Sequence, residues 1–188
     1  MTRGWLIATM GAALLAWSVV ASTLPSEQQP GPLEQFAAAV HSYVQLHRAI
    51  EHELPALRAG SHAHELAESS DAVAAALQTA RANAREGDIF TAAVGALLRT
   101  QISEALDAHG FLPDKVVASS LEEADDNTPL PFVNGRFPWR RGAMMWPCVI
   151  DVLPELPHEL QYRIVGRDLV LLDTHAELVV DILRDAVR

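Results

Sequence analysis

Histidines are the residues of this chain whose type and spacing most suggest chemistry, and there are eight of them. His62 and His64 are separated by one residue, and Glu51, His52 and Glu53 stand shortly before them. Imidazole nitrogens and carboxylate oxygens are good ligands for Zn²⁺ and Cu²⁺. The sequence therefore offers a candidate divalent-metal site with the ligands His47, His52, His62 and His64. The alternative is a set of ordinary surface histidines, because the two rings of a His-x-His loop need not converge.

Motifs of other reactive sites are missing from the sequence. It contains no nucleophile elbow, phosphate-binding loop, HExxH zinc motif or CxxC pair. Asp173 and His175 are close in sequence, but a turn needs polar residues for its own hydrogen bonds, so we assign them to a turn. The single cysteine, Cys148, lies in an apolar run, where we expect a buried and unreactive thiol. We therefore predict no internal disulfide, no catalytic residue and no cofactor.

Composition and charge narrow the class of protein. The 188 residues are 49% hydrophobic and 20% charged, which is typical of one folded domain. The formal net charge is −10, with 14 Lys and Arg against 24 Asp and Glu. Because phosphate binding depends on cationic side chains, we expect no nucleic-acid partner and no attraction to an anionic lipid surface.

The N-terminal residues have the pattern of a secretory signal peptide. Arg3 supplies a positive start, residues 5–20 form an apolar stretch, and small side chains precede a cleavage point that we place after Ala21. An uncleaved membrane anchor is the alternative. Residues 22–31 are polar and contain proline, so we expect a flexible lead-in. The sequence thus predicts an exported protein, periplasmic or secreted.

Three helices are predicted in a helical part that covers residues 32–110. Pro32 suits a first helical turn, and an apolar stripe continues to about residue 53, with one histidine in it: Leu33, Phe36, Val40, Tyr43, Val44, His47 and Ile50. We place a second helix over residues 71–84, after a loop. A third helix, capped by Asp88, runs to residue 108 and ends before Gly110.

The C-terminal part predicts strands. Residues 111–146 carry four prolines and an acidic cluster, and we interpret them as a long, partly ordered connection. A short helix follows between residues 147 and 152. Apolar and polar residues then alternate on both sides of Gly166, which predicts a hairpin with a two-residue turn and with Val165 opposite Asp168. A third strand is predicted to begin near Leu178. We expect one face of this meander to pack on the helices, and the other, wetter face to carry Gln161, Arg163 and Asp181.

The predicted architecture is therefore an α+β domain. A three-helix segment packs with a C-terminal three-stranded antiparallel β-meander, and a signal peptide helix precedes both. Residues 147–188 complete a single domain with residues 32–110.

Three separated segments carry a resemblance. They are residues 43–48 (YVQLHR), 85–91 (REGDIFT) and 162–173 (YRIVGRDLVLLD), and residues 178–181 (LVVD) close the pattern. In this order they resemble a family of uncharacterised exported bacterial proteins, and the likeness covers nearly the whole mature chain. The resemblance implies export, but it implies no activity, ligand or catalytic residue.

Two functions follow as expectations. The first is a small non-enzymatic binding or structural module of the cell envelope, which uses its apolar helix stripe, a free sheet edge and Trp139 and Trp146 to meet an envelope protein or a second copy of itself. A membrane would be contacted only through an uncleaved N-terminal segment. The alternative is a periplasmic protein of divalent-metal binding or metal homeostasis that uses its clustered histidines.

Overall fold

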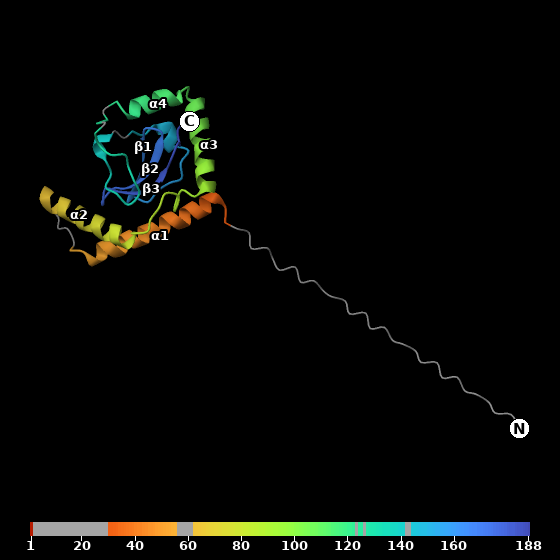
Figure 1. The fold of residues 1–188 in the computed structure, drawn as a ribbon, viewed down its shortest axis with the longest axis horizontal. Helices are drawn as coiled ribbons and strands as arrows, with labels where there is room; N and C mark the ends of the chain where they lie inside the picture. The colour runs from red at the N-terminus through yellow and green to blue at the C-terminus, as the bar shows by residue number, and fades with distance from the viewer. Residues whose placement is uncertain (2–29, 56–61, 123, 126, 142–143) are drawn as a thin grey trace.

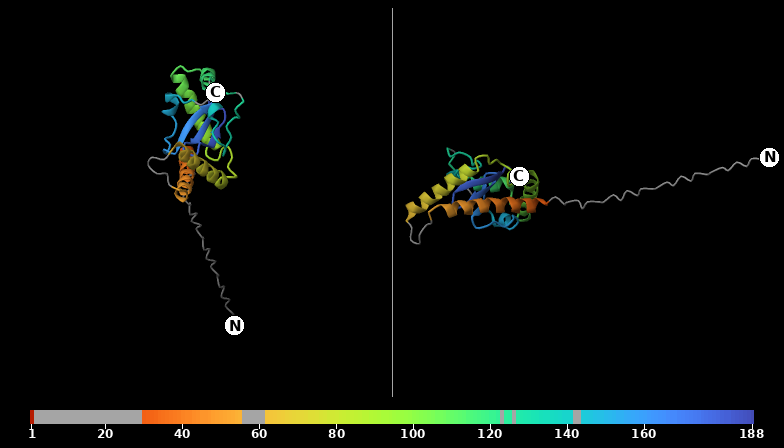
Figure 2. Two further views of the ribbon diagram at one scale, coloured as in Figure 1. Left: turned by 90° about the vertical axis from the view of Figure 1, so that its left-hand side faces the viewer. Right: turned by 90° about the horizontal axis from the view of Figure 1, so that it is seen from below.

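A computed structural model of the chain describes residues 1, 30–55, 62–122, 124–125, 127–141 and 144–188. They form an α+β fold in which helices surround a three-stranded antiparallel sheet of order β1-β2-β3 (Figures 1 and 2). The elements are α1 (Pro32–Glu53), α2 (Ala63–Ala80), α3 (Ala92–Ala108), α4 (Pro113–Ser120), η1 (Trp139–Arg141), α5 (Pro147–Ile150), β1 (Leu160–Val165), β2 (Asp168–Asp173) and β3 (Leu178–Leu183).

The predicted signal peptide, apart from Met1, and most of the predicted lead-in lie outside the described residues. In the part of the chain that the structure describes, every helix is too short or too polar to cross a membrane.

Helix α1 has the bounds that the sequence predicts. Pro32 occupies the first turn, and the side chain of Glu34 accepts a hydrogen bond of 3.0 Å from the Gly31 N–H, which satisfies a free donor at the helix start. The buried residues follow the predicted stripe: Phe36, Val40, Tyr43, Val44 and His47. The stripe therefore carries a hydroxyl and an imidazole into the protein interior together with its apolar groups.

The other two predicted helices begin elsewhere. Helix α2 starts at Ala63 and not at residue 71, because the side chain of Glu65 accepts a hydrogen bond from the His62 N–H and stabilises an earlier start. Helix α3 is capped by Thr91, whose Oγ1 accepts a hydrogen bond from the Val94 N–H. Asp88, the predicted cap, accepts instead from the Arg85 N–H within the preceding turn.

The predicted connection, residues 111–146, contains α4 and η1 and pairs with both outer strands. Residues 134–137 exchange backbone hydrogen bonds of 2.7 to 2.8 Å with Glu177, which directly precedes β3, and with Val179 of β3. Met144 forms two such bonds with Ile164 of β1. The connection therefore pairs with each outer strand over part of its length, at Ile164 of β1 and at Leu178 and Val179 of β3, so the expected free edge is partly covered. Such pairing reduces the edge that is open to another strand.

The hairpin register is the one predicted. Val165 pairs with Asp168, and Tyr162 pairs with Leu171. Gly166 has a φ of +61°, the left-handed conformation that favours glycine in this turn. One face of the sheet joins the main core with α1, α3 and α5, in which Cys148 is buried as expected.

The expectation of a wetter second face holds only for Gln161, which is exposed, and Arg163, which is half-buried. A second apolar cluster covers much of this face, and it consists of Phe137, Val165, Val170, Leu172, Val179 and Ile182. A bulge between Leu171 and Leu172 places one extra residue, Val180, in β3 and changes the alternation of its side chains. Asp181 is therefore fully buried towards the helices, where it accepts hydrogen bonds from the backbone of residues 87–90.

Candidate metal centre

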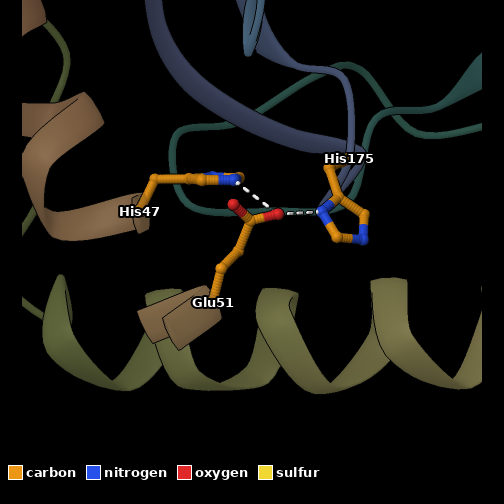
Figure 3. Close-up of side chains that lie close together, drawn as sticks. All are labelled: His47, Glu51 and His175. Carbon is orange, nitrogen blue, oxygen red and sulfur yellow. Dashed lines mark hydrogen bonds and ion pairs between the residues drawn. The ribbon is translucent and has the colours of Figure 1, made fainter. Parts of the chain in front are cut away.

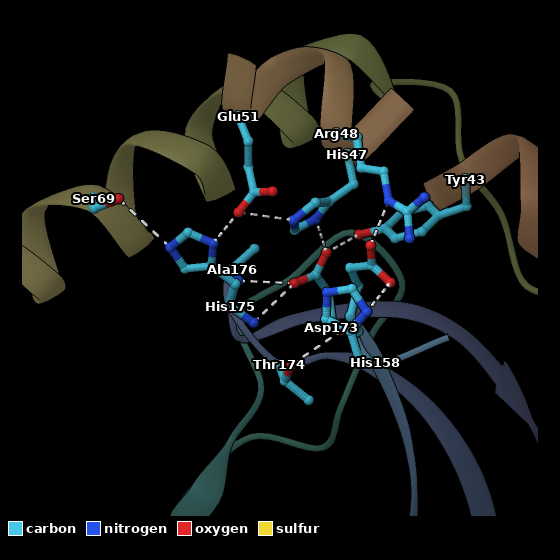
Figure 4. A network of polar contacts seen from close by, with 11 residues as sticks. Tyr43, His47, Arg48, Glu51, Ser69, His158, Asp173, Thr174, His175 and Ala176 are labelled. Carbon is cyan, nitrogen blue, oxygen red and sulfur yellow. Dashed lines mark hydrogen bonds and ion pairs between the residues drawn. The ribbon is translucent and has the colours of Figure 1, made fainter. Parts of the chain in front are cut away.

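The carboxylate of Asp173, at the end of β2, organises the site. Its Oδ1 accepts hydrogen bonds from the backbone N–H groups of His175 and Ala176 at 3.1 and 2.8 Å, and this builds the turn that leads to β3. Its Oδ2 accepts from the Tyr43 hydroxyl at 2.7 Å and lies 2.6 Å from His47 Nδ1 (Figure 4). One fully buried carboxylate thus shapes the turn and holds α1 against it.

His47 and Glu51 lie one helical turn apart on α1, so their side chains share a face. The imidazole of His47 is 1% exposed, and its Nδ1 is taken by Asp173. Its Nε2 lies 3.2 Å from Glu51 Oε1 but has no hydrogen-bond partner of good geometry among the described residues (Figure 3). The helix therefore presents a buried nitrogen lone pair or N–H next to a carboxylate.

His175 completes the group from the turn between β2 and β3. Its Nδ1 contacts Glu51 Oε1, and its Nε2 lies 3.5 Å from the Ser69 hydroxyl of α2. The carboxylate of Glu51 consequently lies between two imidazole rings that come from distant parts of the chain (Figures 3 and 4).

Asp173 and His47 each shift the pKa of the other. Burial lowers the pKa of His47, but its hydrogen bond to Asp173 and the negative charges of Asp173 and Glu51 outweigh burial and raise that pKa above its ordinary value. Burial raises the pKa of Asp173, but hydrogen bonds from His47, Tyr43 and Ala176 outweigh it and lower that pKa. Asp173 is therefore held as an anion, and the imidazole of His47 is held towards it.

The structure brings only one of the four predicted metal ligands into this group. His47 is a member, whereas His52 is exposed in the last turn of α1. His62 and His64 are exposed at the start of α2, where their rings stack on each other with centroids 5.9 Å apart. These two histidines remain near each other, but the group of converging ligands lies elsewhere.

Sequence reasoning assigned His175 to a turn and did not join it to α1. The spacing of His47 and Glu51 was a usable signal, because residues four apart on a helix share a face. The sequence carries no comparable signal for the approach of a residue 124 positions away from Glu51. That approach depends on the packing of α1 against the end of the sheet.

The arrangement fits a metal ion better than a nucleophilic triad. One ligand atom from each of His47, Glu51 and His175 lies within 4.8 Å of the other two. Two ligands bound tetrahedrally to Zn²⁺ at its usual bond lengths are about 3.3 Å apart. His47 Nε2 and Glu51 Oε1 are 3.2 Å apart, whereas His175 Nδ1 lies closer to the same oxygen, in hydrogen-bonding contact. Each imidazole also has a partner for its second nitrogen, namely Asp173 for His47 and Ser69 for His175. Such partners orient histidine ligands in metal sites.

Ser69, His175 and Glu51 also resemble the order of a serine–histidine–acid triad. A triad additionally requires N–H donors that stabilise the oxyanion. Ser69 lies in the interior of α2, where the backbone N–H groups are engaged in helical hydrogen bonds. We therefore do not assign a nucleophilic role to Ser69.

Comparisons of the chain with family models, with curated proteins and with solved structures found no match.

Proposed function

We propose that this protein is a divalent-metal-binding module of the cell envelope, and that His47, Glu51 and His175 bind a zinc-class ion. The observation that carries the proposal is the convergence of two imidazoles and one carboxylate within 4.8 Å. Export, predicted from the N-terminal residues, and membership of the exported bacterial family that the chain resembles are parts of the same proposal.

The second nitrogens of the two histidines support this assignment. Because Asp173 engages Nδ1 of His47, the nitrogen left for a metal is Nε2, the atom without a hydrogen-bond partner of good geometry in the described residues. Because Ser69 lies against Nε2 of His175, the nitrogen that faces Glu51 is Nδ1. Both rings thus direct their remaining nitrogen towards the same carboxylate.

Two nitrogen ligands and one oxygen ligand suit Zn²⁺ and similar first-row divalent ions better than Mg²⁺ or Ca²⁺, which prefer oxygen. In the absence of a metal, Glu51 can hydrogen-bond to either ring. With a metal bound, the three side chains would share one cation.

The test is calorimetric titration of purified, chelator-treated protein with Zn²⁺. We expect one ion per chain with a Kd in the micromolar range or below. Binding should be lost in a Glu51→Gln, His175→Ala double variant. A His62→Ala, His64→Ala double variant is the matched control, because these exposed histidines lie outside the converging group, and it should bind as the unaltered protein does.

Two results would overturn the proposal. One is the absence of saturable binding at millimolar Zn²⁺. The other is binding that survives the Glu51 and His175 substitutions but disappears with those of His62 and His64, which would move the site to the position that the histidine spacing suggests.

A second candidate function is self-association through the connection. Four of its large apolar side chains are at least 48% exposed: Leu112, Leu130, Phe132 and Trp139. Exposed apolar groups of this size are common at protein interfaces. Sedimentation at increasing concentration tests the idea: we expect a dimer that weakens in a Trp139→Ser variant, and a monomer throughout would exclude it.

A further inference from the structure

The proposed centre is closed on one side and open on the other. His47 and Asp173 are 1% and 0% exposed, so the protein interior lies behind the imidazole of His47. Glu51 and His175 are 37% and 32% exposed, so the other two ligands reach solvent. An ion held by all three side chains would therefore face solvent on the side of Glu51 and His175.

In the part of the chain that the structure describes, three side chains converge, one fewer than a closed tetrahedral site needs. Among the described residues, the converging group of histidine, cysteine and acidic side chains ends with His47, Glu51 and His175. Ser69, the nearest hydroxyl, lies against the far nitrogen of His175 and orients that ring.

We propose that the metal keeps a fourth, exchangeable coordination position that faces solvent, and that this position takes a small anionic oxygen- or nitrogen-donor ligand in place of water. This inference rests on the proposed function. Structural zinc sites have four protein ligands, whereas sites with three protein ligands keep an open position for water or another molecule. The burial of His47 against the exposure of Glu51 and His175 places that position on the outer side.

An open coordination position would allow the site to transfer its metal, which a site that only retains a metal does not need to do. An incoming carboxylate or imidazole can bind the ion before a protein ligand leaves, so the metal can pass to or from another molecule by ligand exchange. A bound water at this position would also be more acidic than free water, because the cation stabilises hydroxide.

The test uses Co²⁺ as a spectroscopic substitute for Zn²⁺ and azide as the probe ligand. The purified protein is loaded with one equivalent of Co²⁺, its visible spectrum is recorded, and azide is added. We expect an intense visible spectrum of low-coordinate Co²⁺ that azide shifts saturably, without loss of Co²⁺ from the protein as measured by elemental analysis. The His62→Ala, His64→Ala double variant should give the same spectrum and the same response, because these exposed histidines lie outside the converging group.

The outcomes separate the inference from the proposed function. If Co²⁺ and Zn²⁺ fail to bind, both are overturned. If Co²⁺ binds and Glu51→Gln changes its spectrum, but saturating azide has no effect, the metal site stands and the exchangeable position is overturned.

Discussion

His47 Nδ1 lies 2.6 Å from Asp173 Oδ2, although the two residues are 126 positions apart in the chain. The contact joins the middle of the first helix to the turn between the last two strands, and both groups are almost completely buried. A buried imidazole and a buried carboxylate stabilise each other, because either one left alone would lose a charge-assisted hydrogen bond that water cannot replace. The contact therefore fixes the ring of His47 with its second nitrogen directed at Glu51.

Substitution of Asp173 by Asn should affect both stability and metal binding. The neutral amide cannot replace the anion that holds His47 and Tyr43, so we expect a loss of about 3 kcal/mol in the free energy of unfolding. Because Asp173 orients a ligand without being one, Zn²⁺ affinity should fall about 10- to 100-fold and not vanish. Urea unfolding and calorimetry measure the two effects.

The matched control for this change is Asp151→Asn, because Asp151 is exposed at the end of α5. That variant should match the unaltered protein in both measurements. If Asp173→Asn also keeps its full Zn²⁺ affinity, the role of Asp173 in orienting His47 is wrong.

Much of the fold follows from local rules. Proline at the start of α1 and its apolar stripe predict the whole helix, and glycine at position 166 predicts the pairing of Tyr162 with Leu171. These features depend on residues that are near in sequence. The start of α2 was missed because Gly60, Ser61 and the two serines at 69 and 70 favour a loop, while the bond between Glu65 and the backbone of His62 favours a helix.

The candidate site depends on features that no local pattern contains. The spacing of His47 and Glu51 was visible, but His175 joins them only after the sheet packs against α1. The bulge beside Leu172 similarly reverses the side to which Asp181 points, and alternation alone assigned it to the opposite face. In both cases tertiary packing decided which polar side chains meet.

The pH dependence of stability tests the coupling of His47 and Asp173 in metal-free protein. The pKa of Asp173 is lowered on folding, so its contribution is present above its ordinary value of about 3.9 and is lost as the pH falls through the folded value. The pKa of His47 is raised, so its contribution is present below about 6.5 and is lost as the pH rises through the folded value. This pair should therefore stabilise the fold most between about pH 4 and 6.5.

Urea unfolding in the presence of a chelator, repeated across this range, measures the profile. The variant His47→Gln should lose the decline above about pH 6.5. His41→Gln should retain it, because His41 is an exposed residue of the same helix. Parallel profiles for the unaltered protein and His47→Gln would contradict the coupling.

Replacement of Gly166 by Ala tests the hairpin. The φ of +61° is unfavourable for a residue with a side chain, and we expect a loss of about 1–2 kcal/mol in the free energy of unfolding. An added Cβ would meet only side-chain atoms of Leu121 at 4.0 Å, so the cost comes from the backbone and not from a clash. Gly31→Ala, at a φ of −62° in open space, should cost less, and equal losses would contradict the explanation.

Removal of the Asp181 carboxylate should destabilise the fold more than Asp173→Asn or Gly166→Ala does. Its two oxygens accept hydrogen bonds from the backbone N–H groups of Gly87, Ile89 and Phe90 at 2.7 to 2.9 Å. Asp181→Ala leaves these donors without a partner, and at about 1–3 kcal/mol for each buried donor the loss should reach about 4 kcal/mol or more. Asp181→Asn keeps one acceptor oxygen and should give an intermediate loss, which keeps the test valid if the alanine variant does not fold.

Hydrogen exchange of the amides of residues 87, 89 and 90 should accelerate in the asparagine variant and stay unchanged in Asp107→Ala, at an exposed position of α3. Unchanged exchange in Asp181→Asn would show that these amides are protected by burial alone and that the carboxylate does not hold the loop before α3 to the sheet.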